Sequence, residues 1–100
     1  MEYKIDCLKK IRALADENRL KIMSTLMKRS SSVNSVSKEL AFEQYNVSKH
    51  LRILEQAGLI SQEKNGQKRI YSLTDSVSKN LAKNKLVLPC CTFDFNKLTI

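Results

Sequence analysis

The organisation of this chain is decided by the stretch from Val36 to Ile60, which reads VSKELAFEQYNVSKHLRILEQAGLI. It contains two short amphipathic segments, in which apolar residues recur every three or four positions. These residues are Val36 and Leu40 in the first segment, and Val47, Leu51 and Leu54 in the second. The spacing predicts two helices whose apolar stripes pack on each other, which is the arrangement of a helix-turn-helix.

The polar face of the second segment is rich in groups that hydrogen-bond base edges and phosphates. These residues are Gln44, Tyr45, Asn46, Ser48, Lys49 and Arg52. We place this helix, residues 43–57, in a DNA major groove. Its base-reading candidates are Gln44, Asn46 and Lys49, and its phosphate-binding candidates are Ser48 and Arg52.

The composition is that of one small domain with a polyanionic partner. The 100 residues carry a formal charge of +8, which alone does not separate nucleic acid from an acidic membrane surface. No apolar run approaches the roughly 20 residues of a membrane span, and the charged first ten residues do not resemble a signal peptide. We expect a cytoplasmic protein with reduced thiols, since three cysteines do not make a disulfide framework.

Helical spacing predicts two helices before the decisive stretch and one after it. The first covers Tyr3–Ala15, and the second follows an N-cap at Asp16 and runs to about Arg29. One of the serines at 30–32 caps the helix that contains Val36. The last helix is expected from Ser76 to about Lys85.

Between Gly58 and that last helix the pattern alternates, which is typical of strands. Residues 59–64 and 68–73 flank the dipeptide Asn65-Gly66, which favours a type I′ hairpin turn. This hairpin is expected to be a wing. Its basic residues Lys64, Lys68 and Arg69 are candidates for phosphate or minor-groove contacts, although a solvated hairpin tip explains them equally well.

These elements predict an α+β, mainly α, winged helix-turn-helix with four to five helices and a β-hairpin. We assign residues 1–85 to the DNA-binding domain. Residues 86–100 form an extended tail with Cys90, Cys91 and two phenylalanines, and we expect it to pack on its own domain or on a dimer mate.

Several motifs also resemble those of the ArsR/SmtB repressors. They are LADENRLKI at 14–22, VSKHLRILEQAGLI at 47–60, the Gly66 wing and YSLTD at 71–75. The resemblance covers residues 5–75 and implies a homodimer, held by the first and last helices, that represses transcription from a palindromic operator. It also implies release by a metal ion, metalloid or oxidant.

Two sensing sites of that family are absent here. A Cys-x-Cys on the third helix would fall on Ser32 and Asn34, and a site on the last helix would need histidines, of which none follows His50. We interpret His50 as structural. No acid or oxyanion element accompanies it, so we predict that the protein is not an enzyme.

The cysteines are the remaining clue to an effector. Cys90, Cys91 and Cys7 would bind a soft metal or As(III) if the first helix and the tail meet, but neighbouring residues of a strand point to opposite faces unless the chain turns at Pro89. Redox sensing and plain packing are the other two interpretations. An interaction protein without specific DNA binding, and a repressor without an effector, also stay open.

Overall fold

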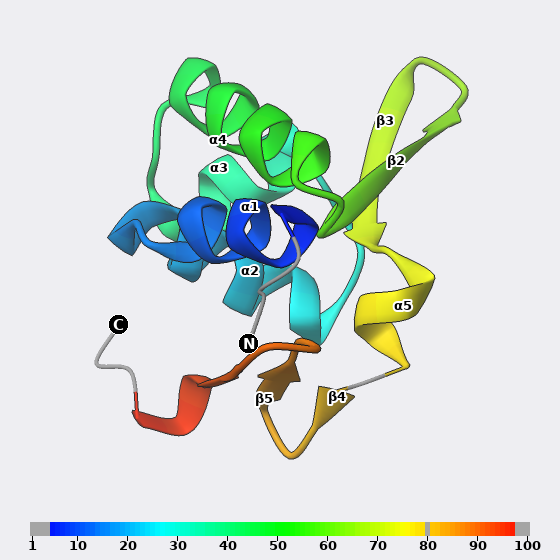
Figure 1. The fold of residues 1–100 in the computed structure, drawn as a ribbon. Coiled ribbons are helices and arrows are strands. Elements are labelled where there is room, and N and C mark those ends of the chain that lie inside the picture. Colours follow the sequence, from blue (N-terminus) through cyan, green and yellow to red (C-terminus); the bar gives the residue numbers. More distant parts are fainter. Residues whose placement is uncertain (1–4, 80, 98–100) are drawn as a thin grey trace.

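The computed structural model describes residues 5–79 and 81–97 (Figure 1). The helices are α1 (Ile5–Leu14), α2 (Glu17–Lys28), α3 (Val33–Leu40), α4 (Gln44–Gln56) and α5 (Asp75–Ser78). The strands are β1 (Ser31–Ser32), β2 (Ile60–Asn65), β3 (Lys68–Leu73), β4 (Leu81–Ala82), β5 (Lys85–Val87) and β6 (Thr92–Asp94), followed by a 3₁₀ turn at Phe95–Lys97. They form two antiparallel sheets with strand orders β1-β3-β2 and β4-β5-β6.

Local signals in the sequence set the helix ends. The Asp16 carboxylate accepts a hydrogen bond from the backbone N–H of Arg19 at 3.0 Å and begins α2. The Ser32 hydroxyl accepts one from the N–H of Ser35 at 3.2 Å and begins α3. Gly58 has φ +80°, a left-handed conformation that suits glycine, and follows the end of α4. The predicted caps are therefore confirmed.

The predicted helix-turn-helix is confirmed as α3 and α4. The apolar residues that defined its two stripes are almost all inaccessible to solvent: Val36, Val47, Leu51 and Leu54 have no exposed surface. They pack with Leu14, Ile22 and Met23 of the first two helices. This burial fixes the polar face of α4 on the outside of the domain, where Figure 1 shows α4 lying beside the β2–β3 hairpin.

The hairpin is the predicted wing, and its turn differs from the prediction. Asn65 pairs with Lys68, so the two-residue loop is Gly66-Gln67. A type I′ turn needs positive φ at both loop residues, and only Gly66, at +68°, has it. The wing also gains a third strand that was not predicted, because Ser31 and Ser32 pair with Tyr71 and Ile70.

Helix α5 ends at Ser78, so the last helix is much shorter than the predicted one, which ran to about Lys85. Lys83 and Asn84 have φ of 47° and 64°, and this pair turns the chain between β4 and β5. A helix cannot pass through two left-handed residues, although asparagine tolerates that conformation. The β4–β5 pairing also means that the C-terminal sheet begins at Leu81, before the predicted tail.

The C-terminal segment packs on its own domain. Leu86, Leu88 and Phe95 are buried in the common core. The N–H of Leu88 donates to the carbonyl of Cys91 at 2.8 Å, so Pro89 and Cys90 occupy the turn between β5 and β6. The chain therefore turns at the cysteine pair, as the thiol interpretation required.

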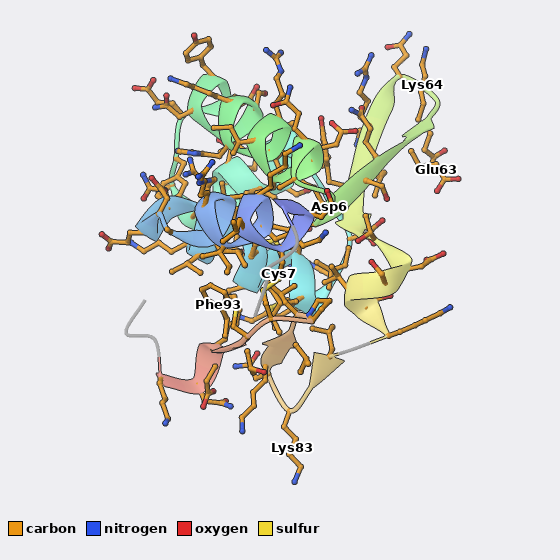
Figure 2. All side chains as sticks on the ribbon, viewed as in Figure 1. Asp6, Cys7, Glu63, Lys64, Lys83 and Phe93 are labelled. Atoms are coloured by element: carbon orange, nitrogen blue, oxygen red, sulfur yellow. A yellow bond between two sulfur atoms is a disulfide. The ribbon has the colours of Figure 1, made fainter. Side chains whose placement is uncertain are left out.

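A disulfide joins Cys7 of α1 to Cys90 at this turn, with Cα atoms 6.4 Å apart. Figure 2 shows Cys7 pointing from α1 towards the C-terminal segment. The expectation of three reduced thiols is therefore wrong for this form of the protein, in which only Cys91 is free. No helix within 5–79 and 81–97 is long and apolar enough to cross a membrane.

Candidate nucleic-acid interface

A groove of about 500 Å³ lies between the recognition helix α4 and the wing. One wall comes from α4 and the start of α3, and the other from β2, β3 and their turn. Its lining residues are Ser32, Val33, Asn34, Gln44, Ser48, Arg52, Glu55, Gln62, Gln67, Lys68, Arg69 and Tyr71. The groove combines three basic side chains with many neutral hydrogen-bonding groups, which suits a polyanion that also presents base edges.

The structure brings five of the predicted DNA-binding residues together in this groove. They are Gln44, Ser48, Arg52, Lys68 and Arg69. Tyr45 and Lys49 lie outside it on the exposed surface of α4, and the Tyr45 side chain is 75% exposed. Lys64 is exposed near the end of the wing (Figure 2).

Asn46 occupies the flank of α4 that faces away from the wing. It is one helical turn before His50, whose ring contacts Arg19, whereas Ser48 and Glu55 line the groove on the opposite flank. Asn46 and the groove residues therefore approach different parts of any duplex that α4 enters.

Sequence reasoning named none of the other seven lining residues as DNA-binding, among them Asn34, Glu55, Gln62 and Gln67. Asn34 restrains a predicted base reader, because the Nε2 of Gln44 donates to its Oδ1 at 2.9 Å. Gln62 donates to Glu55 and accepts from Arg69. The predicted Asn65-Gly66 loop would have placed Gln62 directly opposite Arg69, and the observed register places it on the diagonal. Pairing across the hairpin is therefore the signal that could have found Gln62.

The His50 ring ties the recognition helix to the α1–α2 junction. Nη1 of Arg19 lies 3.3 Å from Nδ1 of His50, and Nε of Arg19 donates to the carbonyl of Ala13 at 2.6 Å. Burial lowers the pKa of His50 below its ordinary value of 6.5, so the ring is neutral at pH 7 and its Nδ1 accepts from Arg19. These contacts support the structural interpretation of His50.

Asp16 also takes part in these contacts of Arg19. The hydrogen bond from the Arg19 N–H holds the pKa of the Asp16 carboxyl below 3.8, and its Oδ2 lies 3.9 Å from Nη1 of Arg19. The side chain therefore stays ionised at neutral pH, where it caps α2 and orients Arg19 towards His50.

A second hollow of about 410 Å³ lies on the other side of α4, against α1. Its lining residues are Lys9, Arg12, Ala13, Arg19, Ile53, Gln56 and Ala57. Three of them are basic and none is acidic, so cationic side chains flank α4 on the α1 side as well as on the wing side.

The cysteines do not form a metal site in this structure. Two of the three predicted ligands, Cys7 and Cys90, are bonded to each other, and Cys7 is 5% exposed. Within the part of the chain that the structure describes, no three His, Cys, Asp or Glu side chains are grouped to hold a metal ion. The disulfide form therefore does not fit a metal or metalloid.

Comparison with known proteins identifies the chain. Residues 16–62 match the model of the bacterial regulatory protein arsR family. The arsenical resistance operon repressor of Bacillus subtilis is 36% identical over 85 residues, which cover 84% of this chain and 78% of that protein. This chain belongs to the arsR family. The predicted family is thereby confirmed, and with it a regulatory protein that is not an enzyme.

Other transcriptional regulators are also similar. HlyU of Vibrio cholerae, a transcriptional activator, is 33% identical over 69 residues, or 69% of this chain and 64% of that protein. Its solved structure superposes with a TM-score of 0.67 and 31% identity, over 74% of this chain and 82% of that one.

The homodimeric winged helix-turn-helix domain of Mb0332 from Mycobacterium bovis gives a TM-score of 0.70 at 21% identity, over 74% of this chain and 69% of that one. This likeness confirms the winged-helix fold.

Proposed function

We propose that this protein binds a palindromic operator as a homodimer and represses transcription. The observation that carries the proposal is the groove between α4 and the wing, which places Arg52, Lys68 and Arg69 around a row of neutral polar side chains. A helix that enters the major groove lies between two phosphate backbones. The three basic side chains beside α4 would face one of these backbones. The Bacillus subtilis relative is likewise named a repressor.

Within this proposal, one group of residues reads bases and another holds phosphates. Lys49 is exposed on the outer surface of α4, one helical turn after Tyr45, and contacts base edges between Gln44 on the groove side and Asn46 on the opposite flank. Ser48, Arg52, Lys68 and Arg69 hold phosphates along the groove, and Lys64 adds a cation near the wing tip. Because it acts on the chromosome, the protein works in the cytoplasm.

The proposed dimer uses α1. Leu8 of this helix is 38% exposed and is, with Tyr45, one of two large apolar side chains that are exposed in the described segments. α5 has only four residues, so it contributes little of the interface that the resemblance assigned to a last helix. A dimer that binds two successive half-sites on one face of DNA needs its two α4 helices roughly 34 Å apart, one turn of DNA.

Substitution of Lys49 and of Lys68 separates base reading from phosphate binding. We expect Lys49→Ala to weaken operator binding roughly tenfold and to reduce the preference for operator over random duplex, because a base contact is lost. Lys68→Ala should weaken both duplexes by the same factor, because a phosphate contact carries no sequence information. Fluorescence anisotropy with both duplexes measures the two effects.

Equal losses on both duplexes for Lys49→Ala would contradict its assignment as a base reader. If the unaltered dimer shows no preference for any duplex from its own upstream region, the repressor proposal fails. The alternative, a winged helix that serves only for dimerisation and protein interaction, would then be favoured.

We also propose that the effector acts on the cysteines. Disulfides of proteins that work in a reducing compartment are usually transient, and the Cys7–Cys90 bond joins α1 to the C-terminal segment. Reduction would release two thiols whose Cα atoms lie 6.4 Å apart, next to the free Cys91. Such thiols bind soft metals and As(III), so the reduced protein is the form that would respond to them.

Arsenite is the probe for this effector site. We expect stoichiometric arsenite to release the reduced dimer from operator DNA, with an affinity loss of at least about tenfold, a typical size for allosteric coupling. The oxidised dimer should not respond, because Cys7 and Cys90 are then unavailable. A Cys91→Ser variant tests whether the third sulfur is needed. Equal responses of the oxidised and reduced proteins would rule out Cys7 and Cys90 as part of the site.

A further inference from the structure

Gln62 lies between an acidic and a basic side chain on the wall of the DNA groove. Its Nε2 donates to both carboxylate oxygens of Glu55, at 3.0 and 3.1 Å. Its Oε1 accepts from Nη1 of Arg69 at 3.1 Å. An amide is suited to this place, because its NH₂ group donates while its carbonyl oxygen accepts, and the two charged partners fix which end is which.

The three side chains come from three elements. Glu55 is in the last turn of α4, Gln62 is on β2 and Arg69 is on β3. Gln62 and Glu55 are half-buried, whereas Arg69 is exposed. This chain of hydrogen bonds therefore ties both strands of the wing to the recognition helix at the bottom of the groove.

Glu55 is the one acidic residue among those that line the groove. In direct contact with Arg69, its carboxylate would form an ion pair and neutralise the guanidinium charge that a DNA phosphate needs. Gln62 donates its hydrogen bonds to the Glu55 carboxylate instead. Arg69 keeps its charge, and only one of its five N–H donors is engaged by Gln62.

The register of the hairpin adds a second reason for this orientation. Lys64 pairs with Arg69 across the two strands, on the same face as Gln62. Like charges opposite each other repel, so Arg69 is favoured on the diagonal towards Gln62 and the groove. Glu63 is on the other face of β2, and Figure 2 shows it pointing away from α4.

We propose that Gln62 is a positioning residue for DNA binding, which separates Glu55 from Arg69 and holds the Arg69 guanidinium free for a backbone phosphate. This inference rests on the proposed function. It assigns to Gln62 a role that needs no contact between Gln62 and DNA.

The test is the salt dependence of duplex binding by Gln62→Leu, a replacement that lacks both hydrogen-bonding groups. Leucine leaves Glu55 free to capture Arg69, so the dimer should bind any duplex roughly tenfold more weakly. The slope of log affinity against log salt should become shallower by about 2, because each protomer loses one phosphate contact. Arg69→Ala should give the same change, and the double variant should show no further loss.

Rescue distinguishes positioning from a merely structural role. Adding Glu55→Gln to Gln62→Leu removes the carboxylate that captures Arg69, so affinity and slope should return towards those of the unaltered protein. Ser61→Leu is the matched control, because Ser61 is exposed on the opposite face of the same strand. It should leave the slope unchanged.

Two outcomes would overturn the proposal while the DNA-binding function stands: an unaltered slope for Gln62→Leu, or losses for Gln62→Leu and Arg69→Ala that add in full. Absence of duplex binding by the unaltered protein would instead remove the proposed function and this inference together. Unfolding midpoints of all variants, measured in parallel, show whether a loss of binding follows a loss of folding.

Discussion

Reduction of the Cys7–Cys90 disulfide is expected to lower the free energy of unfolding of each protomer by about 4 to 5 kcal/mol. The bond links residues 83 positions apart, so it closes nearly the whole chain into a loop. A loop of this length removes a large part of the conformational entropy of the unfolded chain, which is the main source of stabilisation in the chain-entropy model. For a domain of this size the melting temperature should fall by roughly 20 to 30 °C.

Denaturant unfolding with and without a reductant measures this effect, at one protein concentration because dimerisation adds to the apparent stability. The control is Cys91→Ser, which keeps the disulfide and should retain the full response to reductant. The double variant Cys7→Ser/Cys90→Ser should not respond at all. Coincident unfolding curves for the oxidised and reduced unaltered protein would contradict the prediction.

The reduced protein should still fold in the same way. Cys7 is almost fully buried and behaves as a small apolar residue when reduced. Leu86, Leu88 and Phe95 remain to hold the C-terminal segment on the core. Reduction is therefore expected to loosen the connection between α1 and the turn at Cys90 without detaching the recognition helix, which is anchored separately through Arg19 and His50.

The parts of the fold that were predicted correctly depend on neighbouring residues. Asp16 and Ser32 each cap the helix that follows them, and Gly58 follows the end of α4, so a short window of sequence contained the information. The apolar stripe of α4 likewise identified its buried face before any partner was known. The limits of α2 and α4 agree with the predictions to within one or two residues, whereas the predicted start of the first helix at Tyr3 lies outside the described residues.

The parts that were missed depend on residues distant in sequence. β1 exists because Ser31 and Ser32 meet Tyr71 and Ile70, and nothing in the serine run itself indicates a strand. The spacing of Val77 and Leu81 favours a helix, yet Lys83 and Asn84 turn the chain so that Leu86 reaches the core. The disulfide was missed for the same reason, because it joins residues 83 positions apart.

The candidate site was only partly predicted, because it too depends on contacts between residues distant in sequence. Periodicity placed Gln44, Ser48 and Arg52 on the polar side of α4, and the wing supplied Lys68 and Arg69. Periodicity does not show which flank of α4 the wing approaches. The wing approaches the flank of α4 that carries Glu55, so Glu55 and Gln62 line the groove and Asn46 lies on the other side. This arrangement is a tertiary contact, which periodicity alone does not predict.

Salt should weaken operator binding by roughly 10⁴-fold between 50 and 200 mM. Two protomers that each neutralise about four phosphates give a slope of log affinity against log salt near −7. The structure offers the cations Arg52, Lys68 and Arg69 in one groove and Lys64 near the wing tip for these contacts, and the net charge of +8 per chain strengthens the attraction. Anisotropy titrations of the dimer on operator DNA at four or five salt concentrations measure the slope.

Single substitutions separate local phosphate contacts from the general attraction of a basic protein. Arg69→Ala should make the slope shallower by about 2, because a symmetric dimer loses two contacts. Lys28→Ala removes the same charge from the exposed end of α2, outside the groove, and should leave the slope unchanged. Equal changes for both variants would mean that net charge alone determines binding, and a slope near zero for the unaltered dimer would exclude phosphate contacts by this groove. Because counterions are released only where the protein replaces them, the slope counts the phosphates that the dimer neutralises, and its change in Arg69→Ala isolates the contact made by that residue.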